Sequence, residues 1–161
     1  MKRLIAGTTS LAGIGVLVIA AAALGTPGSG VTSTSFAVGT FQELEAKTVT
    51  SDWQARISTK GATDVHVLEN RIAPGGTFGW HSHPGPSIVV VKSGALTLYK
   101  ADDPACTPHV FAAGSGFVDE GGDVHVVRNE GSVEALVYVT SLIPQGAGRR
   151  IDEPSPGNCS F

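Results

Sequence analysis

The chain has 161 residues, of which 42% are hydrophobic and 16% are charged, and its formal net charge is −3. This length suits one domain with a buried core and is too short for two ordinary domains. The composition excludes a disordered chain, and the net negative charge argues against nucleic acid as a partner, because binding to phosphates calls for an excess of basic residues.

The first 25 residues differ in composition from the rest. Lys2 and Arg3 precede an uncharged apolar run, residues 4–24, that ends in small residues. This pattern is typical of a secretory signal peptide. An uncleaved membrane anchor is the alternative, because about twenty apolar residues can span a bilayer. The sequence therefore predicts a secreted or extracytoplasmic protein, or one attached to a membrane through residues 4–24.

Turn residues and alternation divide the remaining chain. Residues 26–40 are rich in Gly, Ser, Thr and Pro, and we expect a flexible lead-in there. After it, short alternating or β-branched runs such as 64–72, 88–91 and 133–142 are separated by Gly and Pro, and no segment favours a helix convincingly. The pattern predicts an all-β sandwich or barrel over residues 41–145.

A pair of histidines, His81 and His83, lies in a stretch that glycine and proline keep from forming a helix. On a strand, side chains two apart point to one face, so both imidazoles would project together, while Phe78 and Trp80 would face a hydrophobic layer on the opposite side. Neutral imidazole is the commonest metal ligand. Two histidines alone also suit a solvated strand, but a third, His125, follows about forty residues later.

These two stretches resemble the two sequence motifs of the cupin superfamily, G-x5-H-x-H-x3-E-x6-G and G-x5-P-x-G-x2-H-x3-N. The matching residues are Gly75, His81, His83, Gly94, Gly114, Gly122, His125 and Asn129. The resemblance covers about residues 64–142. It implies an all-β, single-domain double-stranded β-helix, also called a jelly roll or cupin barrel.

The match departs from the family pattern at two positions. Ser87 stands at the glutamate position of the first motif and Glu120 at the proline position of the second. In the family that glutamate is usually the fourth protein ligand. The resemblance therefore implies a divalent transition metal (Fe, Zn, Ni, Cu or Mn) held by His81, His83 and His125. Ser87 would hydrogen-bond a metal-bound water, and the lost carboxylate would weaken affinity for hard ions such as Mn²⁺.

Further polar residues are candidates for the interior of the barrel. Glu69, Arg71 and Tyr138 would anchor a substrate or act as acid and base if they point inward, and Arg71 would suit a carboxylate substrate. An outward, solvated face is the alternative for all three. Asp123 shares the parity of His125, so it is a candidate for orienting that imidazole.

The chain contains two cysteines, Cys106 and Cys159. In a chain predicted to be exported, this pair suggests one intrachain disulfide that would tether a C-terminal tail, residues 146–161, to the barrel. Two free thiols or an intermolecular bridge are the alternatives.

Two functional classes remain open. One is an exported metal-dependent enzyme with dioxygenase-like chemistry on a small molecule. The other is a non-catalytic cupin that binds a small ligand in the same cavity. The resemblance also makes a homodimer through exposed sheet edges an expectation. Neither the substrate nor the metal can be read from the sequence.

Overall fold

The computed structural model describes residues 25–161, so the predicted signal or anchor segment lies almost wholly outside the described residues. The described chain forms strands and turns without any α-helix, and none of it could cross a bilayer as a helix. Its strands are β1 (Ser29–Phe41), β2 (Glu45–Val49), β3 (Gln54–Ser58), β4 (Thr63–Thr77), β5 (His81–Ser82), β6 (Ser87–Ser93), β7 (Ala95–Lys100), β8 (His109–Ala112), β9 (Gly116–Asp119), β10 (His125–Arg128), β11 (Ala135–Pro144) and β12 (Ile151–Asp152).

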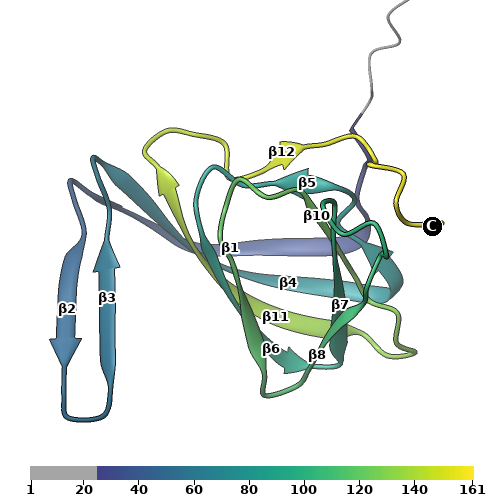
Figure 1. The fold of residues 1–161 in the computed structure, drawn as a ribbon, viewed down its shortest axis with the longest axis horizontal. Coiled ribbons are helices and arrows are strands. Elements are labelled where there is room, and N and C mark those ends of the chain that lie inside the picture. The colour runs from purple at the N-terminus through teal and green to yellow at the C-terminus, as the bar shows by residue number, and fades with distance from the viewer. Residues whose placement is uncertain (1–24) are drawn as a thin grey trace, which may run out of the picture.

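Ten of these strands make one curved sheet that wraps around a core (Figure 1). Its main path runs β12-β5-β10-β4-β11-β6-β9, with β1 added to β4 and the β7–β8 pair added to β10. Every pairing is antiparallel. The prediction of an all-β double-stranded β-helix is therefore confirmed.

The interior follows from the alternation of buried and exposed residues along β6, along most of β11 and in the middle of β4. Inward side chains of β6 are buried while the outward ones are exposed, and β11 continues the same pattern after its first two residues. The main core consists of Leu68, Ile72, Val89, Val91, Leu96, Leu98, Val127, Ala135, Val137 and Val139. Polar Asn70, Ser87 and Ser141 are buried on the same inner face, so the barrel lining is mixed.

A second, smaller hydrophobic cluster lies on the outer side of β7 and β10. Trp80, Tyr99 and Val126 form it, and the disulfide between Cys106 and Cys159 packs against them. The disulfide confirms the predicted pairing and ties the C-terminal tail to the barrel. Burial of Trp80 in this layer also matches its predicted parity.

The expected flexible lead-in at residues 26–40 needs correction, because β1 pairs with β4 along almost its whole length. The segment contains two valines, two threonines and a phenylalanine between positions 31 and 38, and these residue types favour a strand. It therefore adds to the edge of β4, where free backbone hydrogen-bonding groups are available. The abundance of Gly and Ser hid this signal. Of the thirteen β1 residues only Val31 is partly buried, so hydrogen bonds rather than burial hold the strand.

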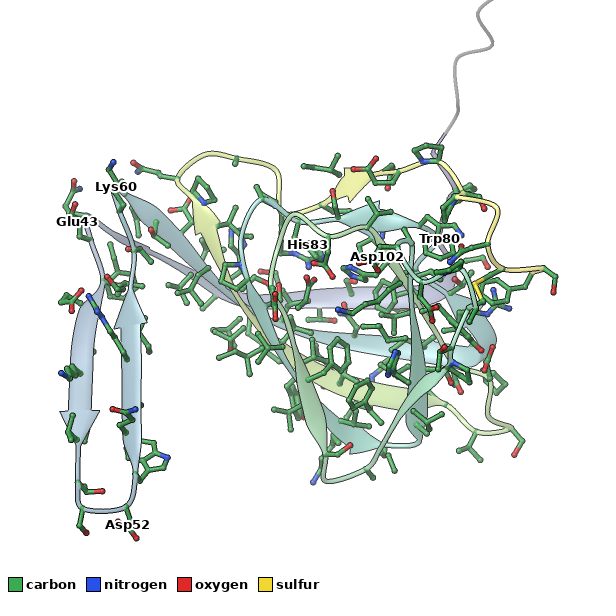
Figure 2. The ribbon with its side chains drawn as sticks, viewed as in Figure 1. Glu43, Asp52, Lys60, Trp80, His83 and Asp102 are labelled. Atoms are coloured by element: carbon green, nitrogen blue, oxygen red, sulfur yellow. A yellow bond between two sulfur atoms is a disulfide. The ribbon has the colours of Figure 1, made fainter. Side chains whose placement is uncertain are left out.

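The β2–β3 hairpin also departs from the expected barrel over residues 41–145. It pairs only with itself, and every residue in its strands is exposed. Figure 2 shows the hairpin turn at Asp52 far from His83 and the barrel. The compact barrel therefore starts at Thr63, with β1 as an added edge strand.

Candidate metal centre

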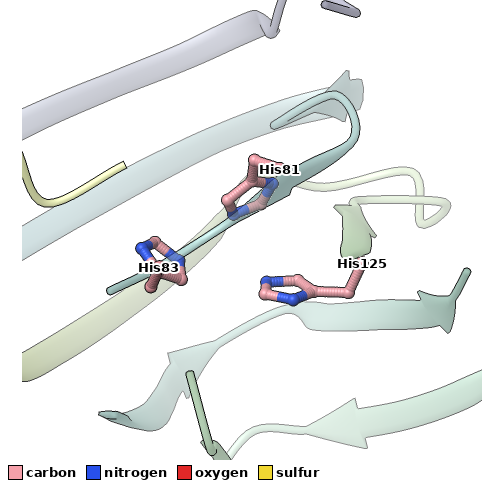
Figure 3. A group of neighbouring side chains, drawn as sticks. All are labelled: His81, His83 and His125. Atoms are coloured by element: carbon pink, nitrogen blue, oxygen red, sulfur yellow. The ribbon is translucent and has the colours of Figure 1, made fainter. Parts of the chain in front are cut away.

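Two neighbouring segments bring the three histidines together. His81 lies on β5, His83 directly follows that strand, and His125 begins β10, where it pairs with His81 across the sheet. Gly79 adopts φ +70° in the turn before β5, a conformation that disfavours other residues. Figure 3 shows the imidazoles converging from the two strands.

The imidazoles are packed closely and shielded from water. Ring centroids are 4.4 Å apart for His81 and His125, 4.9 Å for His81 and His83, and 5.6 Å for His83 and His125. Exposed fractions are 2–6%. One nitrogen from each ring lies within 4.8 Å of the others, so the three could hold a metal ion.

Backbone carbonyls fix the tautomer of each ring. The Nδ1 atoms of His81, His83 and His125 lie 2.8, 2.5 and 3.1 Å from the carbonyl oxygens of Gly79, Arg149 and Asp123. A carbonyl can only accept, so each Nδ1 donates its hydrogen. In a neutral ring the Nε2 atom then keeps its lone pair, which is the form that binds a metal.

A carboxylate that the sequence did not single out, Asp119, lies against two of the three histidines. Its Oδ2 lies 3.1 Å from Nε2 of His83 and 3.4 Å from Nε2 of His125, and the residue is 5% exposed. Asp119 on β9 is the cross-strand partner of Ser87 on β6. The carboxyl group therefore comes from the strand beside the position where the cupin motif carries glutamate.

Burial shifts this cluster toward neutral forms. Desolvation lowers the pKa of His81 to about 2 and also lowers the pKa of His83. It raises the pKa of Asp119, against the attraction of His125 and His83. Nε2 of a neutral His83 presents a lone pair to the Asp119 oxygen, and these two acceptors repel each other unless a proton or a metal ion lies between them. One proton can be shared with only one nitrogen, whereas one metal ion can satisfy every acceptor.

Two of the residues predicted to assist the site, Ser87 and Asp123, lie near the histidines but make different contacts from those predicted. Ser87 is buried and shares a 2.8 Å hydrogen bond with Ser141, one strand over. Asp123 meets His125 through its backbone carbonyl, while its carboxylate is 4.0 Å from the same Nδ1. The backbone carbonyl of Asp123, and not its carboxylate, is therefore the main group that orients His125.

Three candidates lie on the outer face and away from the cavity. Arg71 is paired with Glu69 at 2.8 Å and with Glu134 at 3.0 Å, and its side chain is 50% exposed. Tyr138 is 40% exposed and packs beside Phe36. Leu68, Asn70 and Ile72 of β4 point inward. Glu69 and Arg71, which alternate with them, therefore point outward to solvent, as the alternative prediction had it.

A cavity of about 130 Å³ opens beside the histidines. Its walls are mostly apolar, and Phe78 is among them, in contrast to its predicted orientation, because the turn at Gly79 breaks the alternation between Phe78 and the histidines. Arg149 and Arg150 line it from the loop that joins β11 to β12. Sequence reasoning missed both arginines because nothing local distinguishes them from a solvated tail.

Fold and site together define a small double-stranded β-helix protein with a histidine-rich cavity. The family model described as "Cupin domain" matches residues 68–141, which carry all three histidines. The chain therefore belongs to the cupin superfamily, as its motifs predict. No curated protein matches the sequence.

Solved structures give more distant likenesses. Oxalate oxidase in complex with the substrate analogue glycolate is 29% identical with a TM-score of 0.46, and the match covers 55% of this chain and 45% of that chain. A cupin-like protein from Thermotoga maritima is 21% identical with a TM-score of 0.46, covering 60% of this chain and 79% of the other. A Klebsiella pneumoniae protein with a double-stranded β-helix domain is 19% identical with a TM-score of 0.45, covering 70% and 85%. This chain spans less than half of the oxalate oxidase chain.

Proposed function

We propose that this protein binds a divalent transition metal and uses it to hold or transform a small molecule in the adjoining cavity. The observation that carries the proposal is the convergence of three buried imidazoles, with the Asp119 carboxylate beside two of them. The ligands would be His81, His83, His125 and Asp119. A bound metal would supply Lewis-acid or redox chemistry, depending on its identity.

The residues of the chain keep this site ready. Backbone carbonyls hold each imidazole by its Nδ1 hydrogen, which limits the reorganisation needed to bind a metal. The apolar part of the cavity lining would favour contact with the hydrocarbon part of a small ligand. With Asp119 included, the donor set is three imidazoles and one carboxylate, so the expected bias against hard ions such as Mn²⁺ no longer applies.

Elemental analysis of the purified, untagged chain tests the proposal. We expect near-stoichiometric metal in the parent and none in the His81→Ala/His83→Ala double variant. His109→Ala is the matched control, because His109 is exposed on β8 and should keep full occupancy. An intact fold without metal in the parent, after supply of each candidate ion, would reject the metal site.

Metal identity separates the two functional classes. Bound iron, copper, nickel or manganese with oxygen consumption would support a dioxygenase-like enzyme. Zinc would exclude oxygenase chemistry and leave hydrolytic, isomerising or lyase roles. A loaded protein that binds small molecules without turnover would be a non-catalytic binding cupin.

We further propose that the protein is exported. The disulfide between Cys106 and Cys159 supports this because reducing conditions in the cytosol normally keep thiols free. The apolar N-terminal run agrees with export. The intact mass of the protein recovered outside the cytoplasm would distinguish a cleaved signal peptide from a retained anchor.

A further inference from the structure

The loop between β11 and β12 is fixed directly over the histidine cluster. Its β12 end pairs with β5, which carries His81, and its Arg149 carbonyl accepts the Nδ1 hydrogen of His83. The loop is therefore attached to the site at both places. Side chains at positions 149 and 150 accordingly line the cavity.

The two arginines of this loop differ in their ion pairing. Arg150 is neutralised by Asp152, with 2.6 Å between Nε and Oδ1. Arg149 is half-buried and has no carboxylate within ion-pair distance among residues 25–161. A guanidinium keeps its charge at neutral pH, so Arg149 brings an uncompensated positive charge to the cavity.

The Arg149 side chain is partly shielded from water where it lines the cavity. The pKa of Arg149 itself is lowered, first by burial and then by Arg150. A partly desolvated cation without a partner is costly, and an anion in the cavity would remove that cost.

We propose that Arg149 is a specificity-determining residue that binds the carboxylate of a small organic anion in this cavity. The inference builds on the proposed metal function and names the class of ligand. The cavity volume of about 130 Å³ fits a molecule of roughly benzene size. The planar guanidinium can bind a carboxylate through two parallel hydrogen bonds, while the rest of the ligand lies against the apolar walls toward the histidines.

Calorimetric titration of the metal-loaded chain tests the assignment, with malonate as the anionic probe and malonamide as its neutral counterpart. We expect the parent to prefer malonate, and Arg149→Gln to weaken malonate binding by about tenfold or more. Arg149→Lys should retain part of the affinity, because lysine keeps the positive charge but cannot form two parallel hydrogen bonds to a carboxylate. Arg56→Gln is the control, since it makes the same charge change on the exposed β2–β3 hairpin.

Metal content is measured on every sample, so the experiment can reject the metal site or the role of Arg149 independently of the other. A parent without metal would reject the metal function, and its malonate titration would still decide the role of Arg149. Equal affinity for malonate and malonamide would overturn the assignment. So would unchanged malonate binding in a folded Arg149→Gln variant.

Discussion

At the scale of single residues, this chain differs from the cupin motif in the strand that carries a carboxylate near the histidines. Ser87 occupies the usual glutamate position, and Asp119 lies directly across from it on β9. Cross-strand partners have Cβ atoms about 5 Å apart, close enough to reach one site. In the proposed metal site the ligands would still be three imidazoles and one carboxylate, but the carboxylate would come from a different strand.

This exchange predicts a compensating pair of mutations. Asp119→Asn should weaken metal binding by about tenfold or more, because an amide oxygen is a poorer ligand than a carboxylate. Adding Ser87→Glu to that variant should recover part of the affinity by restoring the motif residue. A competition titration against a chromophoric chelator measures both effects.

The control for this pair is Asp123→Asn. The Asp123 carboxylate is 4.0 Å from His125, whose Nδ1 already donates to the backbone carbonyl, so affinity should barely change. Equal losses for Asp119→Asn and Asp123→Asn would show a general charge effect and argue against Asp119 as a ligand.

At the scale of elements, the C-terminal tail is held by one covalent bond and several contacts. The disulfide joins residues 53 apart. Near it, Phe161 packs on Tyr99 with ring centroids 4.9 Å apart, and the Arg128 guanidinium lies 4.0 Å from the Phe161 ring. The tail thereby covers the outer hydrophobic cluster.

Removing the disulfide with Cys106→Ser/Cys159→Ser should lower the free energy of unfolding by about 4 kcal/mol, because the unfolded chain regains the entropy of a long loop. Urea denaturation under non-reducing conditions gives the value. Chemical reduction of the parent should produce a similar loss, whereas a change below about 1 kcal/mol in both would show that the noncovalent contacts suffice.

At the scale of the whole molecule, the buried imidazoles make stability depend on pH. The pKa of His81 falls from 6.5 to about 2 on folding because of burial. Between these values the unfolded chain binds more protons, so the metal-free protein should lose stability as pH falls below 6.5. The slope from this residue is at most about 1.4 kcal/mol per pH unit.

Denaturation of chelator-treated protein from pH 7 to pH 4.5 measures this dependence. Asp119 has a raised pKa and so acts in the opposite direction above 3.8, which makes the parent's total slope smaller. The difference between the parent and His81→Asn isolates the histidine. Identical pH profiles for the two proteins would contradict a neutral, buried His81.

The outer face of the sheet carries a group of exposed apolar side chains. Exposed apolar side chains cross five neighbouring strands there: Phe36, Val38, Val67, Tyr138, Ile88, Val90 and Val118. Contiguous apolar patches are rarely left in water, and a second copy related by a twofold axis would cover this one. We expect a homodimer through this face.

Ile88→Lys/Val90→Lys should convert that dimer to a folded monomer, as measured by sedimentation. Both positions are about half exposed, at 48% and 49%, so the barrel itself should tolerate the change. Val49→Lys/Ile57→Lys on the exposed β2–β3 hairpin is the control. A monomeric parent at micromolar concentration would contradict the expectation.

The sequence by itself determined the all-β class, the three histidines and the disulfide. Each depends on local information: alternation sets which faces are buried, spaced His and Gly residues identify the motifs, and two cysteines leave few pairings. The parity of Trp80 could be predicted for the same reason.

Only the tertiary structure decided which other groups meet the histidines. Asp119 reaches them through the register of β6 and β9, and Arg149 through the pairing of β12 with β5. Arg71 was a reasonable candidate from its type, but its parity on β4 sends it outward. Register, parity and loop closure arise from long-range pairing of strands, and a one-residue shift reverses every side chain, so residue type and spacing alone could not place these groups.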